Sequence, residues 1–189
     1  LKNNYFKNNN NLKNISFIFE LSSYLKLNFN KIIQVINSFK ELNFRQQIIF
    51  NSKKLMIIND SKSTSLSSSR NLLESYKNIY WIVGGLSKKG DRFELNKIHF
   101  KKIKAFIYGK DKNFFLKVLN KKICSKVSKT LNESLNLIFN DIKKYNSEKK
   151  IILFSPSAAS FDQFKNFEER GKYFNNITKK YIKKFTEYK

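Results

Sequence analysis

The sequence predicts an α/β fold in which a mostly parallel β-sheet is flanked by helices and follows a shorter helical segment. Two observations support this prediction. Apolar runs of four to six residues alternate along the chain with segments of helical periodicity, which is the pattern of parallel strands buried on both faces. In addition, 41% of the 189 residues are hydrophobic, including 19 Phe and 9 Tyr, which is enough to fill a core.

The first predicted elements are two packed helices within residues 14–40. Apolar residues recur on one face of each helix, and residues 27–30 form the connection, with Asn30 as the expected N-cap of the second helix. The domain boundary is expected where this helical pattern ends. It divides the chain into residues 1–43 and 44–189.

The second part of the chain is predicted to alternate between strands and helices. It opens with two short apolar runs, 47–51 and 55–58, that suit either a β-hairpin or two edge strands. The elements that follow are expected in this order: helix 70–76, strand 79–83, strand 103–108, helix 131–145, strand 151–154 and helix 164–185.

Small and polar residues follow three of the predicted strands. The segments are 58–64 (Ile-Asn-Asp-Ser-Lys-Ser-Thr), 84–90 (Gly-Gly-Leu-Ser-Lys-Lys-Gly) and 155–164 (Ser-Pro-Ser-Ala-Ala-Ser-Phe-Asp-Gln-Phe). Because ligands of parallel sheets bind beyond the carboxyl ends of the strands, we expect these loops to form one site. Small residues let the backbone approach a ligand, and helix starts offer free N–H groups, so a carboxylate or phosphate ligand is expected.

The net charge of +24 does not by itself indicate a nucleic-acid-binding protein. Only four of the 38 basic residues are arginine, and the lysines are scattered along the chain among abundant Asn, Ile and Phe, a composition that AT-rich codons favour. We therefore expect no specific nucleic-acid partner, although non-specific attraction to polyanions remains expected.

Other site classes find little support in the sequence. His99 has no second ligand at metal-binding spacing, so no metal site is predicted, and the single cysteine, Cys124, has no nearby histidine. No apolar stretch is long enough to span a membrane, and no signal peptide is visible at the start. The chain begins with Leu1 rather than Met, which suggests a piece of a longer protein.

The three loop segments resemble the Mur ligases, and most closely the members of that family that add D-glutamate. The resemblance rests on residues 58–64, on the strand end Trp81-Ile82-Val83-Gly84-Gly85 with Lys88, and on residues 155–171, whose Ser-Phe-Asp-Gln-Phe-Lys-Asn-Phe-Glu-Glu-Arg-Gly run is long and distinctive. It covers residues 43–189. Upstream, Asn11-Leu12-Lys13-Asn14 resembles the end of the family's central ATP-binding domain.

The resemblance implies a Rossmann-like C-terminal Mur ligase domain over residues 44–189, preceded by a helical remnant of the central ATPase domain over residues 1–43. It implies an ATP-dependent carboxylate–amine ligase of peptidoglycan synthesis. ATP and Mg²⁺ would convert UDP-N-acetylmuramoyl-L-alanine to an acyl phosphate, which the amine of D-glutamate then attacks. A cytoplasmic, monomeric enzyme with these small-molecule substrates is expected.

The resemblance also implies roles for individual residues. Lys62 matches a lysine near the reacting centre and is the expected catalytic residue. Arg45 matches an arginine that contacts the ATP phosphates, and Asp60 matches a carboxylate that meets the nucleotide. Asn11 matches an asparagine near the adenine. The positions that match the D-glutamate seat are Thr64, Lys88, Ser160, Phe161 and Phe167.

Some positions depart from the family's pattern. Phe44 and Asn10 stand where the family usually has histidine, and Ala158 stands where it usually has cysteine. The chain also contains no G-x-x-x-x-G-K-[ST] phosphate loop, no central-domain magnesium ligands and no uridine-nucleotide domain. We therefore expect the chain to be inactive by itself.

Two alternative functions stay open. One is a different amide ligase of the same fold, such as a folylpolyglutamate-type ligase or another Mur ligase. The other is a basic α/β domain that binds RNA or acidic surfaces, which requires lysines and aromatic residues gathered on one face. A positive surface located only opposite the three loops would favour this second alternative.

Overall fold

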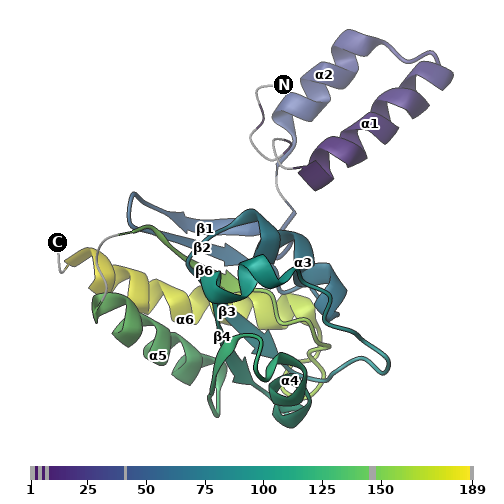
Figure 1. Cartoon of the computed structure of the whole chain (residues 1–189). Helices are drawn as coiled ribbons and strands as arrows, with labels where there is room; N and C mark the ends of the chain where they lie inside the picture. The colour runs from purple at the N-terminus through teal and green to yellow at the C-terminus, as the bar shows by residue number, and fades with distance from the viewer. Residues whose placement is uncertain (1–2, 4–5, 7–8, 41, 145–147, 188–189) are drawn as a thin grey trace. The chain divides into compact units, whose positions relative to one another are not determined.

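The computed structural model describes residues 3, 6, 9–40, 42–144 and 148–187 (Figure 1). The chain divides into two compact units, Leu1–Leu42 and Asn43–Lys189. Within the described residues, no helix is both long enough and apolar enough to cross a membrane.

The first unit contains the two predicted helices, α1 (Asn9–Tyr24) and α2 (Phe29–Ser38). The N-cap of α2 is Asn28, whose side chain accepts a hydrogen bond from the backbone N–H of Lys31, at 3.1 Å. The prediction that Asn30 caps this helix is therefore wrong: the helix starts two residues earlier, and Asn30 lies in its first turn. The small core of this unit contains Phe6, Ile15 and Ile36.

The second unit is built on a six-stranded sheet with the order β1-β2-β6-β3-β4-β5. Only β1 is antiparallel to its neighbour, and the other pairs are parallel. This topology confirms the predicted α/β class with a mostly parallel sheet. The strands are β1 (Gln47–Asn51), β2 (Leu55–Asn59), β3 (Ile79–Gly84), β4 (Ile103–Tyr108), β5 (Cys124–Val127) and β6 (Lys150–Phe154).

Two pairs of helices cover the two faces of this sheet. Helices α3 (Leu66–Ser75) and α4 (Lys112–Leu119) bury Leu73 and Phe115 against one face. Helices α5 (Leu131–Lys144) and α6 (Phe167–Glu187) bury Leu135 and Phe174 against the other, and Figure 1 shows them side by side. Because both faces are covered, the central strand β3 is buried along its whole length.

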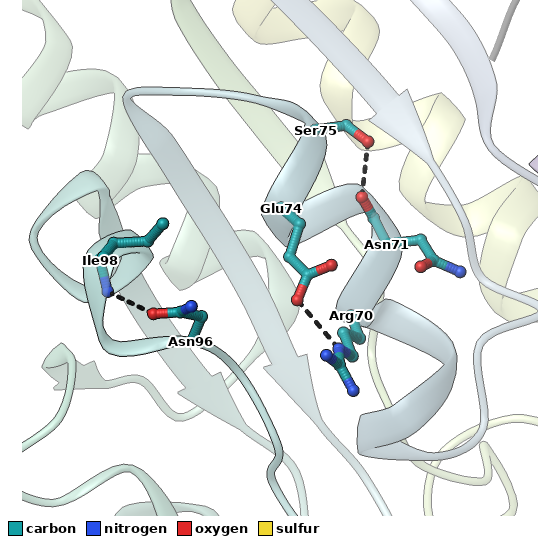
Figure 2. Close-up of polar contacts among 6 residues, drawn as sticks. All are labelled: Arg70, Asn71, Glu74, Ser75, Asn96 and Ile98. Atoms are coloured by element: carbon teal, nitrogen blue, oxygen red, sulfur yellow. Dashed lines mark hydrogen bonds and ion pairs between the residues drawn. The ribbon is translucent and has the colours of Figure 1, made fainter. Parts of the chain in front are cut away.

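The structure differs from the sequence prediction in several elements. Helix α3 begins at Leu66 rather than near Arg70, because Ser65 forms a capping box with Ser68. On its outer face Arg70 and Glu74 form an exposed ion pair, shown in Figure 2 together with the Asn96 cap of the 3₁₀ helix η2 (Lys97–Lys102). The sequence analysis did not predict η2, α4 or β5.

Candidate functional site

The three loops predicted to form a site do meet at the carboxyl edge of the sheet. The loop after β3 pairs with the loop after β6 through two backbone hydrogen bonds between Leu86 and Ala159, at 2.9 and 3.0 Å. A third bond runs from the Gly84 N–H to the Pro156 carbonyl, at 2.9 Å. The two loops are thus fixed to each other by main-chain contacts.

Gly85 allows this close approach. Its φ of +131° lies in a region that L-residues rarely adopt, and a Cβ at this position would lie 2.6 Å from the Ala159 carbonyl oxygen and 3.1 Å from the Ala158 Cβ. A side chain at this position would separate the two loops. The small residue at position 158 also contributes, because it lies fully buried against the glycine.

Arg170 joins the loops after β2 and β6. Its guanidinium donates to the carbonyl of Ser61 at 2.7 Å, to the Ser61 hydroxyl at 3.1 Å and to the carbonyl of Ala158 at 2.9 Å. The side chain is only 1% exposed, and this burial lowers its pKa. Arg170 therefore acts as a buried cross-link between two of the three loops.

Asp60 lies at the end of β2 and is 7% exposed. Its carboxylate accepts hydrogen bonds from the Ser155 hydroxyl at 2.8 Å and from the Gln46 N–H at 3.1 Å. Burial raises the pKa of this carboxyl from 3.8 to about 6, although these two hydrogen bonds and the positive charge of Arg45 lower it. A titratable group held in this way in a loop cluster is typical of functional sites.

A network of buried hydroxyls leads from Asp60 to helix α3. Its centre is Ser69, which is fully buried and lies 2.6 Å from the Ser155 hydroxyl, 2.5 Å from that of Ser157 and 2.8 Å from that of Ser63. Ser155 in turn donates to Asp60. The network couples α3 to the loops after β2 and β6.

Lys62 and Phe167 are in direct contact. The Lys62 ammonium lies over the Phe167 ring, 4.1 Å from its centroid. The Lys62 N–H donates to the carbonyl of Phe44 at 3.0 Å, which links the loop after β2 to the segment that carries Arg45. Arg45 itself is exposed, and its positive charge acts on Asp60.

The Lys88 turn lies against the start of α3. The Asp91 carboxylate accepts a hydrogen bond from the Leu66 N–H at 2.6 Å, and the Asp91 N–H donates to the Lys88 carbonyl at 3.1 Å. Thr64 is exposed and precedes this helix start by two residues. The structure therefore brings Thr64 and the Lys88 turn to the same end of α3, and the side chain of Lys88 is exposed there.

The remaining predicted site residues are placed in different ways. Ser160 is 3% exposed, and its carbonyl accepts from the N–H groups of Gln163 and Phe164. Phe161 is 71% exposed, which is unusual for an aromatic side chain that only serves a core. Asn11 is buried within the first unit. Its predicted contact with adenine remains a prediction, as do the roles of the other site residues.

Sequence reasoning missed Arg170, Ser69 and Asp91 as contributors to this site. Arg170 carried a signal, because it is one of only four arginines in a lysine-rich chain and lies within the distinctive 155–171 segment. Arginine suits several fixed carbonyl acceptors because of its planar donors. Ser69 and Asp91 carried no such signal.

The described part of the chain contains no group of three His, Cys, Asp or Glu residues that could hold a metal ion, so it offers few ligands for Mg²⁺. Asp60 is the only carboxylate of the loop after β2, and both of its oxygens already accept hydrogen bonds. Nucleotide phosphates fit better, since Arg45 supplies positive charge close to Asp60 and the same loop carries the Lys62 ammonium, which lies over the Phe167 ring.

Comparison with known proteins gives a consistent set of relatives, although no protein-family model matches the chain. It is 35% identical over 178 residues to the UDP-N-acetylmuramoylalanine–D-glutamate ligase of Rickettsia felis, covering 94% of this chain and 39% of the relative. It is 38% identical over 177 residues to the ligase of the same name from the Wolbachia of Brugia malayi, covering 93% and 35%. The corresponding ligase of Prochlorococcus marinus is 35% identical over 182 residues, covering 94% and 38%.

These relatives share one name, and nearly the whole of this chain matches each of them. The chain spans less than two fifths of the length of these relatives, and the match lies in their C-terminal part. The resemblance drawn from the loop segments is therefore confirmed by similarity over the full α/β unit. The chain belongs to the Mur ligase family, as a homologue of the C-terminal part of the UDP-N-acetylmuramoylalanine–D-glutamate ligases.

Proposed function

We propose that this chain provides the D-glutamate seat of an ATP-dependent ligase that joins D-glutamate to UDP-N-acetylmuramoyl-L-alanine in peptidoglycan synthesis. One observation carries the proposal furthest. The loops after β2, β3 and β6 are fixed to one another at the carboxyl edge of the sheet by Arg170 and by the Leu86–Ala159 pairing. The same loops carry the residues that resemble the family's site.

In the proposed reaction the carboxylate of the muramoyl substrate first accepts the γ-phosphoryl group of ATP. The neutral amine of D-glutamate then attacks the carbonyl carbon of the acyl phosphate. An amide bond forms as the nitrogen loses a proton to solvent, and inorganic phosphate leaves with the C–O bond electrons. Mg²⁺, when bound, would neutralise charge on the phosphates. Its ligands would come mainly from outside the described residues, since these contain no metal-holding cluster.

The chain's own residues would act by positioning and electrostatics. Lys88 extends from an exposed turn beside the start of α3, where its ammonium and the nearby Thr64 hydroxyl would bind a carboxylate of D-glutamate. The exposed Phe161 and the Lys62–Phe167 pair would border the ligand.

The nucleotide would lie beside the loop after β2. Arg45 would contact the nucleotide phosphates. Asp60 would orient the main chain next to Arg45, because its carboxylate accepts a hydrogen bond from the Gln46 N–H. Asn11, in the first unit, would lie near the adenine. We propose that the first unit is the end of a central ATP-binding domain, as its resemblance to that segment suggests.

The proposal also covers the cellular location of the protein, its oligomeric state and its binding to nucleic acid. The protein would act in the cytoplasm, where the nucleotide substrates are made. It would be a monomer, and it would bind no nucleic acid specifically, because its lysines are spread along the chain. Gel filtration with light scattering would test the monomer directly.

The proposed function is tested by a ligation assay on the protein expressed from its complete gene. Release of phosphate from ATP should require both UDP-N-acetylmuramoyl-L-alanine and D-glutamate. L-glutamate, L-lysine and diaminopimelate are the matched controls and should not replace D-glutamate. Activity with one of these instead would favour the other amide ligases of the same fold, and a protein without ligation in any combination would contradict the proposal.

A further inference from the structure

A pocket lies at the opposite edge of the sheet from the candidate site. Its volume is about 250 Å³, and its lining residues come from the amino ends of β3, β4 and β6 and from η2. Along β3 this edge is five residue steps from Gly84, or about 17 Å at the usual rise per residue. The pocket is therefore separate from the loops that carry the proposed function.

Four lysines line this pocket, together with Asn78, Ile79 and Tyr80: Lys101, Lys102, Lys104 and Lys150. Lys104 is already engaged, since its ammonium lies 2.6 Å from Asp141 and 5.4 Å from the centroid of the Tyr80 ring. In the part of the chain that the structure describes, the other three lysines form no ion pair. The pocket thus carries a surplus of positive charge.

The surroundings of the pocket provide little acid to offset that charge. Asp141 is shared between Lys104 and Lys126, and it accepts a hydrogen bond from the Tyr80 hydroxyl at 2.9 Å. Glu148 accepts from the Asn78 side chain at 2.6 Å. Asp141 is thus paired with lysines, whereas Glu148 keeps its negative charge because its partner Asn78 is neutral. One such carboxylate beside the pocket does not offset the charges of Lys101, Lys102 and Lys150, which line the pocket without an ion-pair partner among the described residues.

From this geometry we propose that the pocket is a second binding site, which takes a small oligophosphate such as pyrophosphate or a free polyphosphate end. Its volume lies below the usual range for sites of drug-sized ligands, so a compact anion suits it better than a whole nucleotide. Lysine ammonium groups bind phosphate oxygens through charge-assisted hydrogen bonds, and several converging ammoniums match an anion with several charges. The site is independent of the proposed ligase activity.

The test measures pyrophosphate binding to the 189-residue chain by isothermal titration calorimetry at fixed salt, with backbone NMR shifts to locate the site. In the double variant Lys102→Ala and Lys150→Ala the dissociation constant should rise about tenfold or more. The matched control removes two exposed lysines of α6, Lys179→Ala and Lys180→Ala, and should change it less than about twofold. The charge-keeping variant Lys102→Arg and Lys150→Arg should retain binding and checks that the pocket still folds.

Three outcomes would overturn the proposal. An equal rise in the pyrophosphate dissociation constant in the pocket variant and in the α6 control would show that pyrophosphate is attracted diffusely to a basic chain. Loss of binding in Lys88→Ala, with NMR shifts confined to residues 84–90, would place the anion in the candidate ligase site instead. A short single-stranded oligonucleotide that binds more tightly than pyrophosphate and shifts the pocket residues would identify a nucleic-acid surface.

Discussion

The chemistry of Asp60 differs clearly from that of an exposed aspartate. Its carboxyl has a pKa of about 6 in the folded chain against 3.8 in the unfolded chain, because burial disfavours the charge. Protonation therefore favours folding, so the stability that this group contributes is fully present below pH 3.8 and is lost as the pH rises through 6. Near pH 7 the buried negative charge of Asp60 lowers the free energy of unfolding. Such a cost is expected of a residue that serves function rather than folding.

Replacing Asp60 by asparagine tests this account. The amide side chain would keep the acceptor for the Gln46 N–H but would not ionise, so the Asp60→Asn variant should gain about 3 kcal/mol relative to the unmodified chain between pH 3.5 and pH 7.5. Urea unfolding at a series of pH values measures the difference. A difference that does not change with pH would contradict the raised pKa.

Gly85 gives a second prediction at this scale. Gly85→Ala would place a Cβ 2.6 Å from the Ala159 carbonyl oxygen and should destabilise the chain by about 3 kcal/mol or more through strain and lost loop pairing. The control is Gly90→Ala, where φ is also positive but no atom lies within 4 Å, so only about 1 kcal/mol is expected. Thermal unfolding of both variants should show this order. Equal costs would mean that the close approach of the two loops is unimportant.

Single residues also show the limit of prediction from sequence. The Gly84-Gly85 turn was predictable because glycine after an apolar run indicates a special backbone. Ser69 was not, because its partners Ser155 and Ser157 lie 86 and 88 residues away in the sequence and nothing local indicates the contact. Sequence patterns report faces and turns, whereas side-chain networks depend on the finished topology.

Among the elements, helix α3 supports the site through Ser69. Ser69→Ala would leave the hydroxyls of Ser63, Ser155 and Ser157 short of a buried partner and should destabilise the chain by about 1–3 kcal/mol. Ser67→Ala, on the exposed side of the same helix, should change stability by less than about 0.5 kcal/mol. Denaturant unfolding compares the two, and a Ser69→Ala variant as stable as Ser67→Ala would show that the network is not needed.

Strands and helices were predictable to different degrees for physical reasons. Strand β4 (Ile103–Tyr108) was predicted with its observed bounds because it is a central strand buried on both faces and reads as an apolar run. Strand β5 (Cys124–Val127) was missed because it lies at the edge of the sheet and no residue in it is buried. Helix α4 was missed because it is only eight residues long.

At the scale of the whole molecule, the second unit has its own complete core. A shortened chain of residues 43–189 should unfold cooperatively, because both faces of its sheet are covered within that unit. It should also be more soluble than the 189-residue chain, because the first unit exposes several large apolar side chains: Phe17, Leu21, Tyr24, Phe29 and Val35. Circular dichroism and solubility measurements test both statements, and a molten shortened chain would place the boundary elsewhere.

The central claim is that the loop cluster seats D-glutamate, and Lys88 tests it most directly. In the enzyme expressed from its complete gene, Lys88→Ala should raise the D-glutamate KM about ten- to hundredfold, because it removes a charge-assisted hydrogen bond to a carboxylate. The ATP requirement should change far less. Lys89→Ala is the matched control, since this neighbouring lysine is also exposed on the same turn and its removal should leave the KM nearly unchanged. Initial rates against D-glutamate at saturating ATP decide the matter: an equal effect of the two substitutions, or a larger shift in the ATP requirement, would contradict the assignment.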